Sequence, residues 1–253
     1  MSVLRAAAAV AMALAVPTAA MAAGNVTAQV VDGDLLVRGD PQHNSISIYS
    51  EIDAATDDRV VVVEGTRGTK VNGADRFHAP LPAGGLDVDM DNGNDRLGIQ
   101  EYRPAFMRLD LGKGHDSLSV FDAGPEGDAT ILLRGGRDAM TTDGMEVGGD
   151  LRLDMGAGKD EVDFTLLTEF GGTTEIEGGT GSDALELSDA TFRGPTTIDL
   201  GRHNDDLTGE SAVFEDAVSL EGGEGRRDEI DFENPPSFAE EPEVSGFESI
   251  SGM

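Results

Sequence analysis

Seven aspartates recur at a nearly constant interval through the middle of this chain of 253 residues, and each ends a short, mostly glycine-rich turn. Successive members of the series are 21 to 23 residues apart: Asp95, Asp116, Asp138, Asp160, Asp183, Asp205 and Asp228. A fixed period in this range is typical of a repeat architecture. If the repeats stack, the carboxylates form a column of like charges, which destabilises a sheet unless counter-ions are present.

The residues around each aspartate predict a strand on either side of the turn. An apolar residue follows two positions after each aspartate: Leu97, Leu118, Met140, Val162, Leu185, Leu207 and Ile230. A second apolar column precedes the turns: Val88, Leu109, Leu132, Leu153, Ile176, Ile198 and Leu220. Alternation of period two indicates half-buried strands. One such unit cannot bury its apolar face alone, so we expect an all-β fold, a parallel β-solenoid with about 22 residues per coil.

Two other all-β folds compete with the solenoid. A β-sandwich does not require the same turn at a constant interval, and the blades of a β-propeller repeat at about 40 residues or more. Along the chain we expect four parts: a signal peptide (1–22), an N-terminal β cap with a degenerate coil (23–85), the solenoid (86–232) and a C-terminal cap (233–253). In the N-terminal cap, Asn44 stands at the aspartate position, and a β-hairpin is predicted between residues 59 and 71. Val244 to Ile250 predict a last strand.

Composition limits the function classes. The chain has 18 Lys and Arg against 49 Asp and Glu, a formal net charge of −31, which disfavours nucleic acid and anionic lipid as partners. A solvated, salt-adapted surface is the alternative explanation of the charge. A short apolar run from Ala6 to Val16, followed by the cleavage signal Ala20-Met21-Ala22, predicts a cleaved signal peptide and a secreted or periplasmic product with no later membrane span. The chain has no cysteine, so a staple other than a disulfide must stabilise it.

Calcium fits the chemistry of the turns. It takes six to eight oxygen ligands and accepts carboxylates together with backbone carbonyls, whereas zinc prefers Cys or His and magnesium keeps its waters. The candidate metal-ligating residues are Asp95, Gly112, Gly114, Asp116, Gly156, Gly158, Asp160, Gly179, Gly181, Asp183, Asp205 and Asp228. The alternative is that the aspartates cap turns. A second acidic column is either a solvated outer face or a further set of ligands: Asp89, Asp110, Asp154, Glu177, Asp199 and Glu221.

One copy carries a resemblance to a known family. The nine residues from Gly178 to Glu186 read G-G-T-G-S-D-A-L-E and fit the pattern G-G-x-G-x-D-x-U-x. The chain therefore resembles the haemolysin-type calcium-binding repeats of repeats-in-toxin (RTX) proteins, and the resemblance implies a calcium-binding β-solenoid. It departs from the family by having one turn per longer coil, which predicts a calcium row on one side only, and by its signal peptide. We expect the Asp138 copy not to bind, because its turn looks one residue short and Leu133 replaces the strand acid. The Asp228 turn is one residue long.

These patterns favour an exported, non-catalytic calcium-binding repeat protein with a structural, adhesive or surface-associated role. The alternative is a calcium-dependent, polysaccharide-active enzyme of the β-helix lyase type, although no cluster of catalytic type is evident in the sequence. His115, Arg137 and Lys159 stand just before turn aspartates and predict a basic strip that either balances local charge or binds an acidic polysaccharide. The threonines are too irregular for an ice-binding face.

Overall fold

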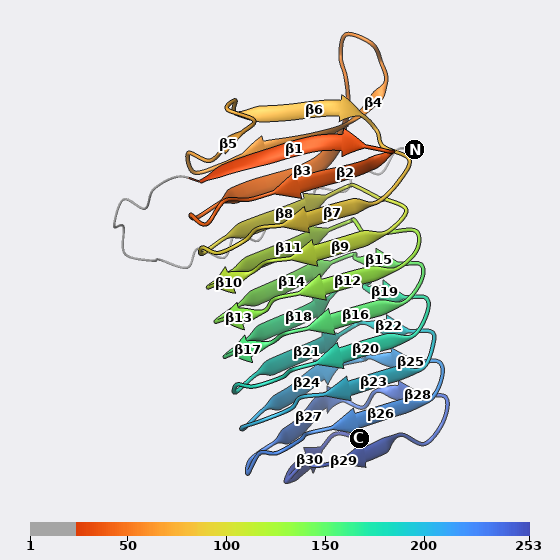
Figure 1. The fold of residues 1–253 in the computed structure, drawn as a ribbon. Helices are drawn as coiled ribbons and strands as arrows, with labels where there is room; N and C mark the ends of the chain where they lie inside the picture. Colours follow the sequence, from red (N-terminus) through yellow and green to blue (C-terminus); the bar gives the residue numbers. More distant parts are fainter. Residues whose placement is uncertain (1–23) are drawn as a thin grey trace.

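The computed structural model describes residues 24–253, which form an all-β, parallel solenoid (Figure 1). The predicted signal peptide, residues 1–22, lies outside the described residues. From residue 24 to residue 253 the chain has no helix, and so none that is long and apolar enough to cross a membrane. The predicted fold class is confirmed.

Two 11-stranded sheets run along the molecule. One sheet contains the strands that precede the turns: β7 (Leu86–Asp89), β9 (Met107–Asp110), β12 (Ala129–Leu132), β16 (Leu151–Asp154), β20 (Thr174–Glu177), β23 (Thr196–Asp199), β26 (Val218–Glu221) and β29 (Glu243–Ser245). The facing sheet contains those that follow: β8 (Arg96–Gln100), β11 (Ser117–Phe121), β14 (Ala139–Asp143), β18 (Glu161–Thr165), β21 (Ala184–Ser188), β24 (Asp206–Glu210), β27 (Glu229–Asn234) and β30 (Ser249–Ser251). Within these sets each strand pairs in parallel with its counterpart in the next coil. Equivalent side chains therefore form ladders.

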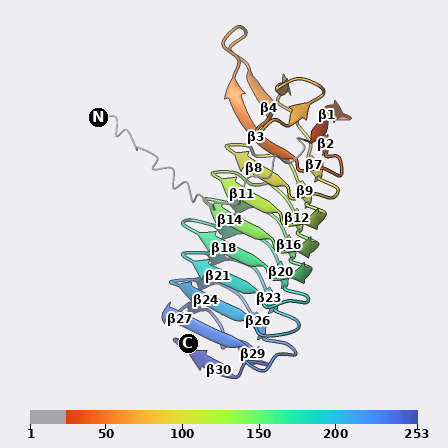
Figure 2. The ribbon, with the colours of Figure 1, turned by 90° about the vertical axis from the view of Figure 1, so that its left-hand side faces the viewer.

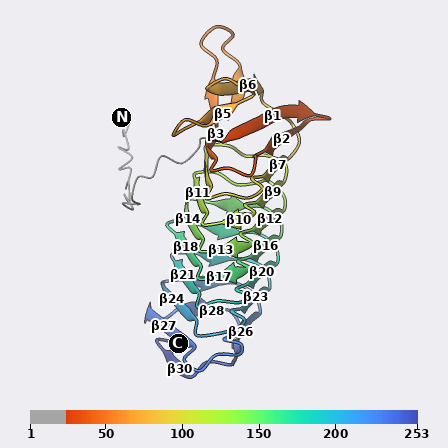
Figure 3. The same ribbon diagram turned by 60° about the vertical axis from the view of Figure 1, so that its left-hand side comes forward.

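Two small sheets close the opposite edges of the coils. At the glycine turns lie β10 (Lys113–Gly114), β13 (Gly135–Gly136) and β17 (Ala157–Gly158), which are visible in front of the larger sheets in Figure 3. The other edge holds β15 (Glu146–Val147), β19 (Glu169–Phe170), β22 (Thr191–Phe192), β25 (Val213–Phe214) and β28 (Ser237–Phe238). The phenylalanines of these strands stack with ring centroids 4.8–5.1 Å apart, so the corner phenylalanines pack as core.

The N-terminal cap is mostly antiparallel, with one parallel pairing between β1 and β5. It comprises β1 (Asn25–Val31), β2 (Asp34–Arg38), β3 (Ser45–Ile52), β4 (Arg59–Gly65), β5 (Lys70–Val71) and β6 (Arg76–Pro80), with β3 and β4 extending beyond the first coils in Figure 2. β4 pairs with β3 and β6, whereas β5 pairs with β1. The predicted hairpin between residues 59 and 71 is therefore wrong, because β4 pairs with β3 and β6 and not with β5. At the other end, residues 243–251 form two strands rather than one.

Strand register corrects one predicted column. Leu132 aligns with Asp110 and Asp154, whereas Ile131 aligns with Leu109 and Leu153 and is fully buried. The inward column before the turns therefore contains Ile131, and Leu132, not Leu133, takes the place of the strand acid. The interval of 23 residues between Asp160 and Asp183 also has a structural cause. Leu166 and Leu167 both have positive φ and form a bulge between β18 and β19.

Candidate functional site

The seven turn aspartates form one buried ladder along the solenoid. All seven aspartates are 0–3% exposed. The backbone N–H of each donates to the Oδ1 of the aspartate in the following coil, at 2.7–3.0 Å from Asp95 through to Asp228. Asn44 begins the ladder by donating its N–H to Asp95 Oδ1 at 2.6 Å, and Glu248 ends it by accepting from Asp228 N–H at 2.8 Å. Half of each carboxylate therefore caps the neighbouring coil, as the turn-capping alternative expects.

The other half of each carboxylate has no protein partner. In all seven residues Oδ2 is buried and makes no hydrogen bond. A buried polar atom without a partner costs about 1–3 kcal/mol, and more if it is charged. Seven such atoms in consecutive coils are a property of the repeat, because each coil reproduces the same geometry.

Asn44 indicates which groups the unpartnered Oδ2 of each turn aspartate faces. It occupies the aspartate position in the first coil, since Ile46 pairs with Leu97 two residues beyond each turn. Its Nδ2 donates to the carbonyl oxygens of its own turn, Asp40 at 2.8 Å and Gln42 at 2.9 Å. These carbonyls stand four and two residues before Asn44. In the aspartate turns an oxygen replaces this donor, so we infer that Oδ2 faces the two corresponding carbonyls and that a proton or a cation must lie between them.

Burial weakens the acidity of these groups. Desolvation raises the pKa of Asp95, Asp116, Asp138 and Asp205 to about 7, against the lowering effect of the backbone hydrogen bond that each accepts. The pKa of Asp183 rises to about 6 for the same reason. Neighbouring aspartates of the column raise several of these pKa values further. Ionisation at neutral pH is therefore unfavourable without a compensating positive charge.

Close stacking of the coils explains why a glycine stands two residues before most of the turn aspartates, and we call these glycines the inner set. A methyl group added to Gly114 would lie 1.3 Å from the carbonyl oxygen of Gly93, and at Gly136 it would lie 1.4 Å from that of Gly114. Gly158 and Gly181 meet the same limit. The other predicted ligand glycines form an outer set, four residues before the aspartate: Gly112, Gly156 and Gly179. Their φ angles are 86–90°, and an added methyl group would also lie only 1.4–2.1 Å from a carbonyl oxygen of the preceding coil.

The Asp138 turn has the full length, contrary to the prediction. β13 pairs in register with β10 and β17, and Arg134 occupies the outer glycine position with φ 76°. The turn looked short because an arginine is unusual in left-handed backbone. The Asp228 turn is one residue longer, as predicted: Arg202 bridges to Glu224, which leaves three residues before Asp228 instead of two.

The second acidic column lies outside the turns. Asp110 forms ion pairs with Arg134 at 2.7 Å and Arg108 at 3.7 Å, and Glu177 pairs with Arg152 at 2.7 Å. From residue 24 onward, no three His, Cys, Asp or Glu side chains gather closely enough to hold a metal ion among themselves. A cation in the turns would take one carboxylate per coil and depend on backbone carbonyls for its remaining protein ligands.

Sequence reasoning missed two parts of the ladder. It placed Asn44 in register without recognising its donor role, and it did not recognise Glu248 as the last acceptor. Glu248 follows Gly246 and precedes Ile250 by two residues, which is the spacing between each turn aspartate and its first inward apolar residue. That spacing was the available signal.

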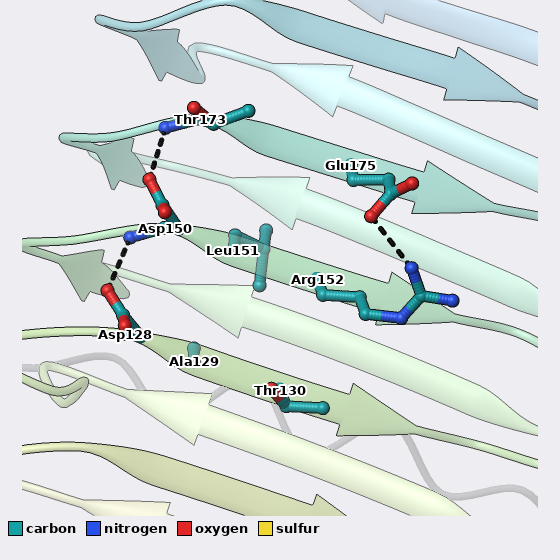
Figure 4. Close-up of a pocket in the computed structure, with 8 residues that line it drawn as sticks. All are labelled: Asp128, Ala129, Thr130, Asp150, Leu151, Arg152, Thr173 and Glu175. Carbon is teal, nitrogen blue, oxygen red and sulfur yellow. Dashed lines mark hydrogen bonds and ion pairs between the residues drawn. The ribbon is translucent and has the colours of Figure 1, made fainter.

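A shallow hollow of about 230 Å³ lies on the outer face of β12, β16 and β20 (Figure 4). Its polar groups bind one another. Asp128 Oδ1 accepts from the Asp150 N–H at 2.9 Å, Asp150 Oδ1 accepts from the Thr173 N–H at 2.8 Å, and Arg152 donates to Glu175 at 2.7 Å. These contacts join neighbouring coils, so the polar groups of the hollow have a structural role.

No family model matches the chain, and no curated protein or solved structure is detectably similar to it.

Proposed function

We propose that the protein is an exported, non-catalytic calcium-binding solenoid with a structural or surface-associated role, in which calcium stabilises the stacked coils. One observation carries the proposal: seven consecutive buried Oδ2 atoms have no protein partner. The signal-like N-terminus and the RTX-like nonapeptide from Gly178 to Glu186 support it.

The donor set suits calcium. Each turn offers one carboxylate oxygen and, by analogy with Asn44, two carbonyl oxygens that point toward it. Coils stacked about 4.8 Å apart bring the oxygens of adjacent turns within reach of one ion. Calcium accepts such mixed, irregular oxygen sets, whereas magnesium requires nearly ideal octahedral geometry. A bound calcium would supply the positive charge that the buried column lacks.

Calcium would also serve as the staple in a chain without cysteine. An ion that binds only the folded chain adds its binding free energy to folding. Extracellular modules bind calcium with dissociation constants of about 10⁻⁴–10⁻³ M. At ~1 mM calcium each such site would add about 0.4–1.4 kcal/mol. Several sites in one column would make folding depend on the calcium-rich exterior.

Thermal unfolding with calcium or with a chelator tests the proposal. We expect calcium to raise the Tm of the full chain. The rise should shrink in the triple variant Asp116→Asn, Asp160→Asn, Asp183→Asn, because an amide supplies its own donor to the turn carbonyls.

A control variant, Glu161→Gln, Glu186→Gln, Glu229→Gln, removes the same charge from exposed positions of the outer face. It should keep the full calcium effect. Equal melting in calcium and in chelator would refute the proposal, and an equal loss in both variants would show nonspecific screening.

A further inference from the structure

Three unpaired cations line the glycine-turn edge of a strongly acidic protein. Lys113, Arg137 and Lys159 are exposed and stand in three consecutive coils. None of the ion pairs found among residues 24–253 involves them, although the chain has 49 acidic residues. The edge therefore offers positive charge that no carboxylate of the described chain neutralises through a close contact.

The backbone beside these cations carries few side chains. The strands β10, β13 and β17 pair in parallel there, and apart from Lys113 they contain only glycine and Ala157 (Figure 3). We call this surface, with its three cations, the turn shelf. Lys113 pairs with Gly135 and so lies two positions before the column that contains Arg137 and Lys159. A linear polymer that crosses the shelf obliquely would meet one cation in each coil, and the coils are about 4.8 Å apart.

Side-chain contacts to the backbone fix part of the shelf. Asn94 Oδ1 accepts from the His115 N–H at 3.0 Å, and His115 Nδ1 accepts from the Arg137 N–H at 2.7 Å. This second ladder runs beside the aspartate ladder and holds the backbone that carries Arg137. The shelf is thus joined to the coil by hydrogen bonds between neighbouring turns.

We propose that the turn shelf binds a linear acidic polysaccharide through the carboxylates or sulfates of successive sugars. His115 is the ring side chain on this edge, and β10, β13 and β17 contain no Phe, Tyr or Trp on which successive bases could stack, which disfavours single-stranded nucleic acid. At physiological ionic strength charges are screened over about 8 Å, so the local shelf can act despite the net charge. This inference uses surface cations only and goes beyond the proposed calcium sites.

Binding of the full chain to heparin, polygalacturonate and neutral dextran, measured by calorimetry, tests the shelf. We expect both acidic polymers to bind and dextran not to bind. The variant Lys113→Ala, Arg137→Ala, Lys159→Ala should lose affinity by about tenfold or more, since three close charge contacts disappear.

The matched control, Arg59→Ala, Arg67→Ala, Arg96→Ala, removes the same charge from residues nearer the N-terminal cap that have no ion pair in the described chain. It should change affinity less than about twofold. Both variants must melt like the parent. Equal losses in the two variants, no binding, or equally tight and equally shelf-dependent binding of single-stranded DNA would overturn the assignment. Assays with and without calcium separate this result from the calcium proposal.

Discussion

Replacing a buried turn aspartate by asparagine should stabilise the calcium-free protein, whereas replacing it by alanine should not. Asp116 is a suitable position, because it is buried, its Oδ2 has no partner and burial raises its pKa to about 7. Asparagine keeps an acceptor for the Asp95 N–H. It also places an amide donor where Asn44 contacts its turn carbonyls.

The magnitude follows from the pKa of Asp116. Burial raises it from 3.8 to about 7, and each unit corresponds to about 1.4 kcal/mol. With allowance for partial solvent screening, the ionised residue costs roughly 2–4 kcal/mol in the folded state above pH 7. Asp116→Asn should recover most of this. Asp116→Ala relieves the charge but leaves the Asp95 N–H without its acceptor, which costs about 1–3 kcal/mol.

Urea unfolding at about pH 8 in chelator measures both free energies. We expect Asp116→Asn to unfold at higher urea than the parent, and Asp116→Ala to unfold at lower urea than Asp116→Asn. In calcium the parent should gain more than either variant. If Asp116→Asn is no more stable than the parent in chelator, Oδ2 does not face the turn carbonyls and the reasoning fails.

Three further predictions follow from the same geometry. Without calcium, the folded aspartates hold protons that the unfolded chain has already lost, so the free energy of unfolding should fall as pH rises from about 4 to about 7 and then level off. Urea titrations across this pH range measure the fall, and the same slope in the triple asparagine variant would contradict the prediction. Gly136→Ala should lower the free energy of unfolding by about 3 kcal/mol or more, because the new methyl group would lie 1.4 Å from the Gly114 carbonyl oxygen. Gly135→Ala should be nearly neutral, because the nearest atom to its methyl group is 3.6 Å away. Equal Tm values for the two variants would contradict the close stacking of the turns. Phe192→Ala removes a ring that stacks on two others and should cost about 3–5 kcal/mol, whereas Phe192→Leu should cost less; equal urea midpoints for the two would show that the stack adds nothing.

The repeat period was sufficient to predict the architecture. A constant interval with apolar residues two positions after each aspartate leaves few alternatives to stacked parallel strands, and the observed pairing of Leu97 with Leu118 and Met140 follows it. The same reasoning placed Asn44 in the first coil correctly. The alignment went wrong at Leu132, because two adjacent leucines and an isoleucine all fit an apolar position and only strand register decides between them.

The arrangement inside the turns was harder to predict. An aspartate after glycines can cap its own turn, cap the next coil or bind a cation, and all three uses favour the same sequence. The structure shows that Oδ1 accepts the aspartate N–H of the preceding coil, which the spacing did not reveal. The left-handed backbone of Arg134 was equally hidden, since that conformation is unfavourable for arginine and is maintained by the neighbouring coils.

A crystal structure of the full chain grown in calcium, with anomalous scattering recorded at long wavelength, would show directly whether calcium occupies the turns. We expect a row of anomalous peaks on the glycine-turn side only, each about 2.3–2.6 Å from the Oδ2 of a turn aspartate. The predicted ligands include Asp116, Asp160 and Asp183. Turns without anomalous density, in which Oδ2 instead donates a hydrogen bond to its own turn carbonyls, would contradict it.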